Sequence, residues 1–594
     1  MASSDSSSLH NLVLKDDPPA SNDPSAIPPS PPPGPPASST IAKAISANME
    51  VIPPTKEART VVLCFDGTGD QFDADNSNVE QFFSMLKKDD RKQQVVYYQS
   101  GIGTYTSPAV MTPFLAKVGK TLDSMVAWNL NAHVMGGYEF IMQNYEAGDK
   151  ICIFGFSRGA YIARALAGML HKVGLLPPCN HNQVPFAYKM FTRTDETGWK
   201  QSTAFKKAFC VDVDIEFVGV WDTVSSVGII PHRLPFTASN TCIKTFRHAV
   251  SLDERRAKFK ANLYNRPTKL EAKLGTQPGE MPKAAVGPSP SLADVVSTGI
   301  ETIEGLPEQM SQSISHDSGI SFDADPAKVA KNLKKRKNKT NQRVQEARFN
   351  AEQEGHEHEE TDVLEVWFAG CHCDVGGGSV ANDVRHNLAR IPLRWMIRQC
   401  FLANTGIQFY GPLLRTVGLD PNALYPIVQS RPAVMTVLPT VPTQPQHDRD
   451  STAATLVDSS TPPDETSTVT IGYANQALPV GPDGQVMNPM SEEEEDLRDL
   501  MSPIYDQLSL VWGWWLLELV PMRHRVQAEN NVWGGKWSVN LGHGRKIPKR
   551  TQKRGELMVH RSVKVRMELD EKLLPEGKKY VPKATWQVEP KWVD

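Results

Sequence analysis

The sequence predicts an α/β fold built on a doubly wound, mostly parallel sheet, and three observations carry this prediction. Short apolar runs rich in β-branched residues, such as TVVLCF at residues 60–65, have the unbroken hydrophobicity of strands that are buried on both faces. Helical patterns separate these runs, and alternating strands and helices favour a parallel sheet. With 594 residues, of which 40% are hydrophobic, the chain can build a large core around that sheet.

The first patterned block, residues 58–180, contains most of this alternation. After the strand at 60–65, Ser77 and Glu80 have the spacing of a capping box and predict the start of a helix. The further elements that we expect in this block are a strand over 94–99, a long helix over 120–145, a strand from Lys150 and a helix that ends at Gly174. The other patterned blocks are 200–262, 362–425 and 500–594.

Three stretches have a composition that favours disorder over a packed core. They are the Ser/Pro-rich tail 1–54, the insert 267–361, and a stretch rich in Pro, Thr and Asp at 431–495. We therefore expect a fold with long disordered insertions. Its principal domain spans 55–430, and a C-terminal segment, 496–594, packs on that domain.

Composition and charge exclude several classes of protein. The formal net charge of −3 gives no overall attraction to nucleic acid, so we expect no nucleic-acid partner. Eight cysteines without a CxxC pair do not form the pattern of a disulfide framework or a zinc site, and the cluster at 371–374 (CHCD) supplies no evident four-ligand set. We expect reduced thiols, no bound metal and no cofactor.

The N-terminus and the most apolar stretch indicate the cellular compartment that we expect for the protein. No basic region followed by an apolar one is evident at the N-terminus, so no secretory signal is expected. The stretch 508–521 is shorter than the roughly 20 residues that a helix needs to span a bilayer, and it contains Glu518. We expect a cytoplasmic protein that makes at most a peripheral contact with membranes.

A serine between two glycines lies where a strand passes into a helix, in the sequence Gly155-Phe156-Ser157-Arg158-Gly159. On such a turn the serine is strained and its hydroxyl points out of the sheet, while the glycines let neighbouring elements approach. The N–H of Arg158, at the helix N-terminus, would point towards an oxyanion formed at that hydroxyl. Ser157 is therefore the candidate nucleophile. The alternative is a serine that only caps the helix.

A serine nucleophile needs a base and an acid that orients the base, and in this type of fold they follow in the order serine, acid, histidine. Asp222 ends the predicted strand in VDIEFVGVWDTVSSVG. His372 lies in a loop after the strand in LEVWFAGCHCDVGGG, and Asp374 is expected to order that loop. The alternatives are a turn or helix-capping role for Asp222, and a core position or a polar contact within its loop for His372. His560 is the substitute base if the loop faces away.

A second oxyanion donor should come from the loop after an early strand. The sequence CFDGTGD at 64–70 places a glycine there, which lets a backbone N–H approach the reacting carbonyl. We assign this N–H to Gly67 or Thr68, with Asp66 ordering the loop. The alternative is an ordinary turn. The same sequence resembles the first motif of phosphatases with an aspartate nucleophile. Cys64 occupies the position of that aspartate, which rejects this chemistry.

Several motifs, taken together and in order, resemble a known family. They are FDGTGD, YYQSGIGT, GDKICIFGFSRGAYIARALAGML, VGVWDTVSSVG, FRHAVSLDERR, EVWFAGCHCDVGGG and NLARIPLRWMI, and they cover most of residues 58–410 outside the insert. The chain resembles the α/β-hydrolase domain shared by type VI secretion phospholipase effectors and a large set of uncharacterised fungal proteins. This resemblance implies an α/β-hydrolase-like catalytic domain over 55–430, with Ser157 as nucleophile, Asp222 as acid and His372 as base.

The resemblance also implies hydrolysis of acyl esters, with a phospholipid, another lipid or a small ester as the substrate. Two functions of other classes stay open. A catalytically silent scaffold would use the fold to bind a partner. An acyltransferase would pass the acyl group to an alcohol in place of water.

The Trp-rich stretch 512–519 raises a separate question about substrate access. It holds three tryptophans and is followed by Arg523 and Arg525. The pattern predicts either an interfacial helix that lies near the site and contacts lipid headgroups, or a helix of the core. Arg255 in FRHAVSLDERR is expected in a salt network, and the alternative is a contact with a substrate phosphate.

Overall fold

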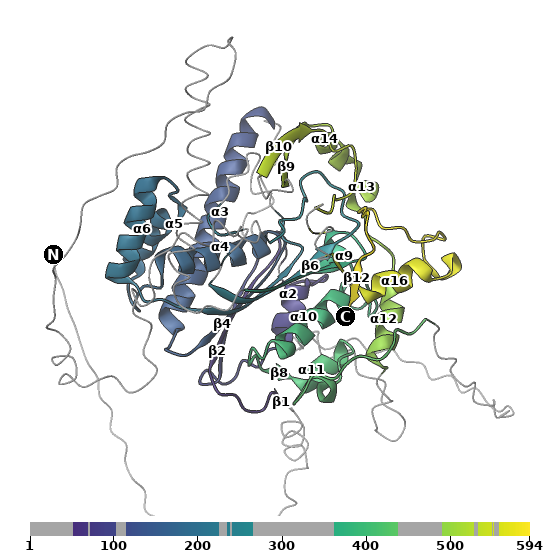
Figure 1. The fold of residues 1–594 in the computed structure, drawn as a ribbon, viewed down its shortest axis with the longest axis horizontal. Helices are drawn as coiled ribbons and strands as arrows, with labels where there is room; N and C mark the ends of the chain where they lie inside the picture. The colour runs from purple at the N-terminus through teal and green to yellow at the C-terminus, as the bar shows by residue number, and fades with distance from the viewer. Residues whose placement is uncertain are drawn as a thin grey trace, which may run out of the picture. The chain divides into compact units, whose positions relative to one another are not determined.

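A sheet of eight strands forms the centre of the structure (Figure 1). Its order is β12-β11-β7-β6-β5-β4-β2-β3, and every neighbouring pair is parallel. The strands are β2 (Thr60–Phe65), β3 (Gln94–Gln99), β4 (Lys150–Phe156), β5 (Ile215–Trp221), β6 (Ile243–Ser251), β7 (Asp362–Phe368), β11 (Met558–His560) and β12 (Lys591–Val593). The predicted doubly wound, mostly parallel α/β fold is confirmed.

This computed structural model describes residues 51–101 without 69 and 71, 115–224, 234–264 without 238, 239 and 241, 361–436, 490–527, 533–548, 551 and 557–594. They belong to the unit Glu50–Asp594. The predicted disordered tail, insert and linker lie largely outside the described residues. Where they overlap, two regular elements lie at least partly within these stretches. Strand β1 (Val51–Ile52) pairs with β8 (Phe409–Tyr410) inside the expected tail, and helix α12 (Glu492–Leu500) begins inside the expected linker.

The order of the strands reverses beside β2. The chain leaves β2 for β3 on one side and then crosses to β4 on the other side. In doubly wound sheets, the loops at the carboxyl ends of the strands diverge at such a point and leave room for a ligand. The loop after β2 begins with Asp66 and the turn after β4 begins with Ser157, so both candidate loops lie at this point.

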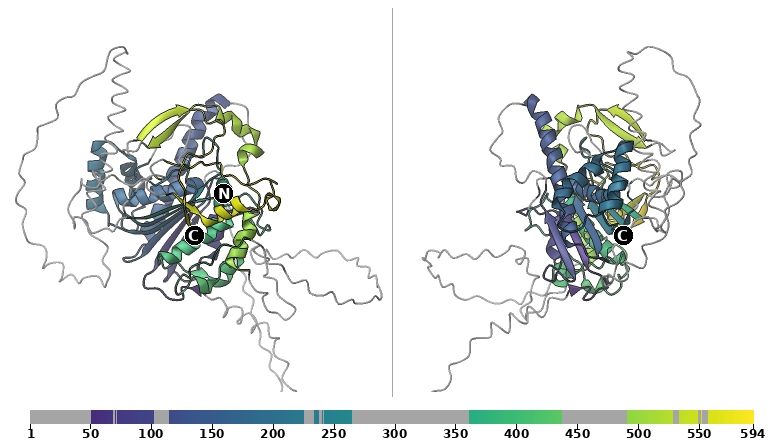
Figure 2. Two further views of the ribbon diagram at one scale, coloured as in Figure 1. Left: turned by 45° about the vertical axis from the view of Figure 1, so that its right-hand side comes forward. Right: turned by 90° about the vertical axis from the view of Figure 1, so that its left-hand side faces the viewer.

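Helices cover both faces of the sheet, and alternate side chains of β2 pack against different helices. Val62 lies in one core cluster and Val61 in the other. Successive side chains of a strand point to opposite faces, so one strand contributes to both layers. The helices are α2 (Asn78–Met85) and α10 (Arg390–Leu402) on the first face, and α3 (Leu115–Asn144), α4 (Ser157–Val173) and α5 (Val184–Thr192) on the second (Figure 2).

The predicted helix boundaries near the site are confirmed. Ser77 is the N-cap of α2 and forms a capping box with Glu80. Gly174 is the C-cap of α4, with φ of +73°, a conformation that glycine adopts without strain.

The C-terminal segment extends the sheet as well as packing on it. β11 pairs with β7, and β12 pairs with β11. Helix α16 (Arg561–Glu568) follows β11 directly. The sequence patterns did not predict these two strands, because three residues are too few to show a hydrophobic period.

Smaller elements connect this frame. They are η1 (His181–Gln183), α6 (Glu196–Phe209), α9 (His372–Gly376), α11 (Gly411–Thr416), η3 (Pro421–Ala423), α13 (Gln507–Leu510), η4 (Trp512–Trp514), α14 (Trp515–Glu518), β9 (Met522–Gln527), β10 (Trp533–Ser538) and η5 (Glu571–Leu573). β9 and β10 form an antiparallel hairpin that lies beside α13 and α14 (Figures 1 and 2). In the described part of the chain, no helix has both the length and the apolar character to cross a membrane.

Candidate active site

The turn between β4 and α4 holds Ser157 in a strained conformation. Its φ is +57°, in the left-handed region that residues other than glycine rarely adopt. Phe156 is the N-cap residue, and Ser157 is the first residue of the helix. The alternative role of Ser157 as the helix cap is therefore wrong.

Both glycines of the motif are required by close packing. A Cβ on Gly155 would lie 2.5 Å from the carbonyl oxygen of Gly159, and a Cβ on Gly159 would lie 2.2 Å from the carbonyl oxygen of Phe65. Atoms cannot approach that closely, so only glycine lets the loop after β2 lie against the first turn of α4.

The structure brings together the three side chains that the sequence assigns to the site. His372 Nε2 lies 2.7 Å from Ser157 Oγ, and His372 Nδ1 lies 2.6 Å from Asp222 Oδ2. All three residues are buried. When the Nδ1 proton is donated to Asp222, Nε2 is left to accept the serine proton, which is the arrangement of an activated nucleophile.

Hydrogen bonds with residues of the neighbouring strand β6 orient Asp222 and its turn. It directly follows β5 and has a φ of +39°. The N–H of Ser251, at the end of β6, donates to Asp222 Oδ1 at 2.9 Å. The N–H of the next residue, Thr223, donates to His248 Nε2 at 3.0 Å. Both the carboxylate and the turn that carries it are thereby held in place.

Arg545 is a residue of this site that the sequence patterns did not reveal. It is buried, and its guanidinium donates to both carboxylate oxygens of Asp222, with Nη2 2.8 Å from Oδ2. It also donates to the carbonyl oxygens of Ser251 and Phe259. Arg545 lies 323 positions from Asp222, in a stretch without a recognised site motif. No signal in a single sequence indicates this pairing, which depends on the tertiary fold.

Burial and charge act against each other at Asp222 and His372. Burial would raise the pKa of Asp222, but the charge of Arg545 and the hydrogen bonds from His372 and Arg545 outweigh it, so this pKa lies well below its usual range. Burial lowers the pKa of His372 and outweighs the opposing hydrogen bond to Asp222. The pair therefore rests as a carboxylate and a neutral imidazole, the state that a general base requires.

His372 begins the short helix α9, where the sequence predicted a loop. Asp374 Oδ2 accepts hydrogen bonds from the Cys371 N–H at 2.8 Å and from the Tyr505 N–H at 3.0 Å. These bonds join the turn that presents the histidine to the C-terminal segment. The Asp374 carboxylate is therefore placed to order the residues around His372.

Gly67 and Thr68, the two candidate oxyanion donors in the loop after β2, differ in their hydrogen bonds. The Gly67 N–H already has an acceptor, since it donates to Asp66 Oδ1 at 2.7 Å. Asp66 also accepts from Ser77 Oγ at 2.7 Å and Tyr98 OH at 2.8 Å, and these bonds order the loop. Among the described residues, no partner bonds the buried Oγ1 of Thr68.

The same loop abuts the nucleophile turn. A Cβ on Gly67 would lie 2.8 Å from Cδ1 of Phe156, the residue before Ser157. The N–H of Arg158 lies in the first turn of α4, where backbone N–H groups have no acceptor within the helix. The loop after β2 and the first turn of α4 therefore meet next to the residue that precedes Ser157.

Two residues considered for the site have other contacts. His560 ends β11, with Nδ1 2.7 Å from Ser562 Oγ and the ring stacked on Phe368 at 4.8 Å. Burial lowers its pKa to about 3, and no substitute base is needed, since His372 faces Ser157. Arg255 Nε donates to Asp506 Oδ2 at 2.7 Å, so the predicted salt network is confirmed.

The Trp-rich stretch 512–519 lies beside the candidate active site. It forms the short turns η4 and α14, not the single helix that the sequence predicted. The Trp514 ring lies 5.6 Å from the Phe259 ring, and the Phe259 ring lies 4.9 Å from the imidazole of His372. One aromatic side chain thus separates this stretch from the histidine.

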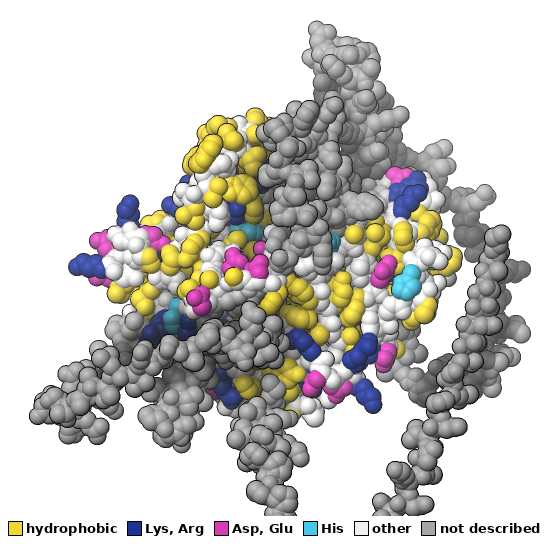
Figure 3. Space-filling model, turned by 180° about the vertical axis from the view of Figure 1, so that it is seen from behind, with side chains coloured by type: hydrophobic (Ala, Val, Ile, Leu, Met, Phe, Trp, Pro, Cys, Tyr) yellow, Lys and Arg dark blue, Asp and Glu magenta, His cyan; other side chains and the backbone are white. Residues whose placement is uncertain are grey.

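Residues 510–520, called here the exposed apolar turns, present apolar side chains to solvent. Trp512 is 75% exposed, and Leu516 and Leu519 are each 61% exposed, so the alternative of a core helix is wrong. Seen from behind in Figure 3, hydrophobic side chains gather at the upper left of the molecule, where α13 and α14 lie. Glu518 is buried and anchors the turns by accepting hydrogen bonds from Ala257, Asn540 and Gly542.

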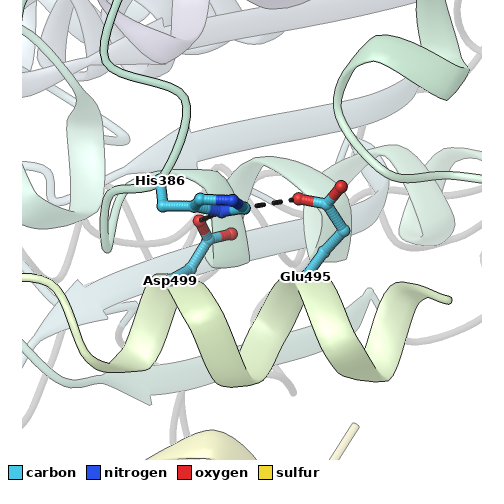
Figure 4. A group of neighbouring side chains, drawn as sticks. All are labelled: His386, Glu495 and Asp499. Atoms are coloured by element: carbon cyan, nitrogen blue, oxygen red, sulfur yellow. Dashed lines mark hydrogen bonds and ion pairs between the residues drawn. The ribbon is translucent and has the colours of Figure 1, made fainter. Parts of the chain in front are cut away.

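One group of side chains has the composition of a metal site. His386, Glu495 and Asp499 point toward one another from the segment before α10 and from α12 (Figure 4). His386 Nδ1 lies 3.1 Å from Asp499 Oδ1 and 3.6 Å from Glu495 Oε2. Arg390 and Arg394 already bind these carboxylates, at 3.1 Å and 2.6 Å. The group is best explained as an ion-pair network that docks α12 on α10.

The fold and the site place this protein among the α/β proteins that carry a Ser-His-Asp chain at the carboxyl end of the sheet. It has a doubly wound α/β sheet with a hydrogen-bonded Ser-His-Asp chain at the ends of β4, β5 and β7. A family model described as "T6SS, Phospholipase effector Tle1-like, catalytic domain" matches residues 59–399, more than half of the chain. The protein belongs to this family.

Individual relatives have low sequence identity to this chain. An uncharacterized protein of Saccharomyces cerevisiae, YEL023C, is 27% identical over 584 residues, which cover 88% of this chain and 81% of that protein. A crystal structure of an uncharacterized protein from Pseudomonas aeruginosa is 15% identical over 62% of this chain and 48% of that chain, with a TM-score of 0.27. The Tle1 effector bound to the VgrG spike of the type VI secretion system is 17% identical over 39% of this chain and 50% of that chain, with a TM-score of 0.19. The chain thus spans about half of each solved structure.

Proposed function

We propose that this protein hydrolyses carboxylic esters of lipids, phospholipids foremost, through an acyl-enzyme formed on Ser157. The observation that carries the proposal is the hydrogen-bonded chain from Ser157 Oγ through His372 to Asp222. Membership of a family of phospholipase effectors supports a lipid ester as the substrate. The positions of the three residues, directly after β4, β5 and shortly after β7, fit the order of an α/β-hydrolase.

The reaction would proceed in two halves. His372 Nε2 takes the Ser157 proton while Oγ attacks the ester carbonyl, and Asp222 stabilises the imidazolium that forms. The Arg158 N–H and Thr68 donate hydrogen bonds to the oxyanion of the tetrahedral intermediate. The imidazolium then protonates the leaving alcohol. In the second half, His372 activates a water molecule that hydrolyses the acyl-enzyme.

A lipid ester must leave a membrane or another aggregate to reach Ser157, so a lipid esterase needs an apolar surface beside its site. The exposed apolar turns supply such a surface one aromatic residue away from His372. Tryptophan and leucine side chains suit the boundary between headgroups and acyl chains. We place the peripheral membrane contact of this protein at these turns.

The test is a panel of lipid esters and a fluorophosphonate probe, applied to the wild type and to Ser157→Ala. The substitution removes the nucleophile, so it should abolish both turnover and labelling while the circular dichroism spectrum stays unchanged. Ser84→Ala, in α2, is the matched control and should keep both. Labelling that survives Ser157→Ala would contradict the assignment of the nucleophile.

The same experiment separates the two other functions. A folded wild-type protein that takes no probe and turns over no ester would be a binding scaffold. A protein that is labelled on Ser157 but yields a new ester when an alcohol is added would be an acyltransferase. Hydrolysis to the free acid as the main product supports the proposal.

A further inference from the structure

The C-terminal segment reaches the interior of the site through Arg545. This residue lies outside residues 59–399, which match the family model. Its stretch is anchored to the rest of the chain close by, since the Asn540 side chain donates to the Arg255 carbonyl at 2.6 Å and accepts from Lys260 Nζ at 2.7 Å. The position of Arg545 is therefore set by packing of the segment on the rest of the chain.

All three nitrogen atoms of the guanidinium are used. Nη1 donates to Asp222 Oδ1 and to the Ser251 carbonyl, at 3.1 Å for the latter. Nη2 donates to Asp222 Oδ2 at 2.8 Å and to the Phe259 carbonyl, and Nε donates to the same carbonyl at 3.1 Å. A planar fork of this kind fixes the plane of the carboxylate as well as its distance.

The orientation of that plane matters for His372. Asp222 Oδ2 accepts from His372 Nδ1, and the same oxygen accepts from Arg545 Nη2. If the carboxylate rotated, the hydrogen bond from His372 Nδ1 to Oδ2 would break. That bond stabilises the tautomer in which Nε2 carries no proton and can accept the Ser157 proton. We propose that Arg545 is a positioning residue that holds Asp222 in line with His372, so that the C-terminal segment is a working part of the active site.

Charge gives Arg545 a second effect. Asp222 is a buried carboxylate, and the Arg545 guanidinium offsets its charge, so that Asp222, neutral His372 and Arg545 together carry no net charge. Other charges that face His372 are Glu254 and Arg256, which pair with each other at 2.8 Å. Removal of the Arg545 charge therefore leaves an uncompensated anion beside His372, which favours the imidazolium.

Two substitutions separate orientation from charge. Arg545→Lys keeps the charge and loses the fork, so kcat should fall by about 10-fold to 100-fold, as for other residues that orient a reacting group. The acid limb of kcat/KM should stay near the wild-type position. Arg545→Met loses both the charge and the fork. Its kcat should fall at least as much as that of Arg545→Lys, and the acid limb of kcat/KM should move to higher pH. The substrate is a short soluble ester, so that lipid binding does not contribute.

Arg566→Met is the matched control, because it also removes a buried arginine of the C-terminal segment, one that donates to the carbonyl oxygens of Leu500 and Ser502. It should lower the melting temperature without moving the acid limb. A folded Arg545→Met protein with the wild-type kcat and acid limb would overturn the proposal. If Arg545→Met does not fold, Arg545→Lys decides, and an unchanged kcat in that variant would overturn it equally.

The inference rests on the proposed function, but it can be tested apart from it. In the Ser157→Ala protein, the titration of the His372 imidazole can be followed by NMR without any turnover. Adding Arg545→Met should raise the His372 pKa, and no change would contradict the inference. Absence of ester turnover and probe labelling in the wild type would instead contradict the proposed function.

Discussion

Two residues of the candidate site have backbone conformations that their side chains disfavour. Ser157 has φ of +57° and Asp222 has φ of +39°. Each such conformation costs on the order of 1–3 kcal/mol and persists only where the surroundings hold it. Here the surroundings are the buried strands β4 and β5, whose ends place both side chains on His372. These strained backbone conformations are therefore what direct the Ser157 and Asp222 side chains towards His372.

The lowered pKa of His372 predicts the pH dependence of ester hydrolysis. The imidazole must be neutral to accept the Ser157 proton, so activity is present above its pKa and is lost as the pH falls through it. Burial lowers this pKa from the ordinary value of 6.5. The midpoint of the acid limb of kcat/KM should therefore lie below 6.5. A soluble ester that does not itself ionise reports it, and a midpoint at or above the ordinary value would contradict the assignment of the base.

Thr68 can be tested as an oxyanion donor by two substitutions. Thr68→Val removes the buried hydroxyl at nearly constant volume, and kcat should fall by about 10²-fold to 10³-fold if that hydroxyl binds the oxyanion. Thr68→Ser restores the hydroxyl and should recover most of the rate. If Thr68→Val keeps the wild-type kcat, the side chain is not the donor, and the backbone N–H of Thr68 remains the only contribution from this residue.

At the scale of elements, the exposed apolar turns combine exposure with a firm anchor. Glu518 points inward and binds the backbone and side chains of other segments, while Trp512 and Leu516 point outward. Because the turns are anchored, substitution of the outward side chains should not unfold them. That separation makes membrane binding testable at this surface.

Replacing Trp512, Leu516 and Leu519 together by Ser should weaken binding to phospholipid vesicles and slow lipid hydrolysis. Hydrolysis of a short soluble ester should be unchanged, since these three side chains are mostly exposed, whereas Ser157, His372 and Asp222 are buried. Ile427→Ser is the control, because Ile427 is 77% exposed but lies in another part of the chain. Vesicle sedimentation measures the binding, and equal loss in the control would contradict a local membrane contact.

A second element-scale feature is the network of buried ion pairs between α10 and α12. Arg394 contacts Asp496 and Asp499, and all three residues are buried. Arg394→Met would leave two buried carboxylates without this partner, which typically costs about 3–5 kcal/mol. Urea unfolding should show the loss. Arg498→Met is the control, since Arg498 forms a more exposed pair with Glu494 and should change stability by less than about 1 kcal/mol.

At the scale of the whole molecule, the segments before and after residues 437–489 are joined by structure as well as by the chain. β11 completes the sheet beside β7, α12 pairs with α10, and Arg545 binds Asp222. These contacts involve different residues in different parts of the fold. The C-terminal segment is therefore integral to the fold and to the candidate site.

The contacts of β11, α12 and Arg545 predict how the protein behaves when its chain is cleaved between residues 437 and 489. A specific protease site placed between residues 437 and 489 should allow cleavage without separation of the halves, because the sheet and the ion pairs hold them together. The cut protein should run as one species in size-exclusion chromatography and keep its ester turnover. Separation of the halves, or loss of turnover while they stay together, would contradict this account.

Much of the frame and part of the site could be predicted from local patterns. The strand at 60–65, the capping box at Ser77 and the stop at Gly174 each depend on neighbouring residues, so a single sequence shows them. Short strands such as β12 and the turns at 512–519 could not be predicted, because their conformation depends on the surface against which they pack.

The sequence by itself determined the alternation of strands and helices, the glycine-flanked turn at Ser157, and the order in which Asp222 and His372 follow it, since all of these are written in local spacing. Only the tertiary structure decided that Gly67 is engaged by Asp66, that the tryptophan-rich turns face solvent, and that Arg545 clamps Asp222 from 323 positions away. The physical reason is that hydrogen bonds and burial depend on distances in space. Residues far apart in the chain acquire those distances only when the sheet and its C-terminal strands have assembled.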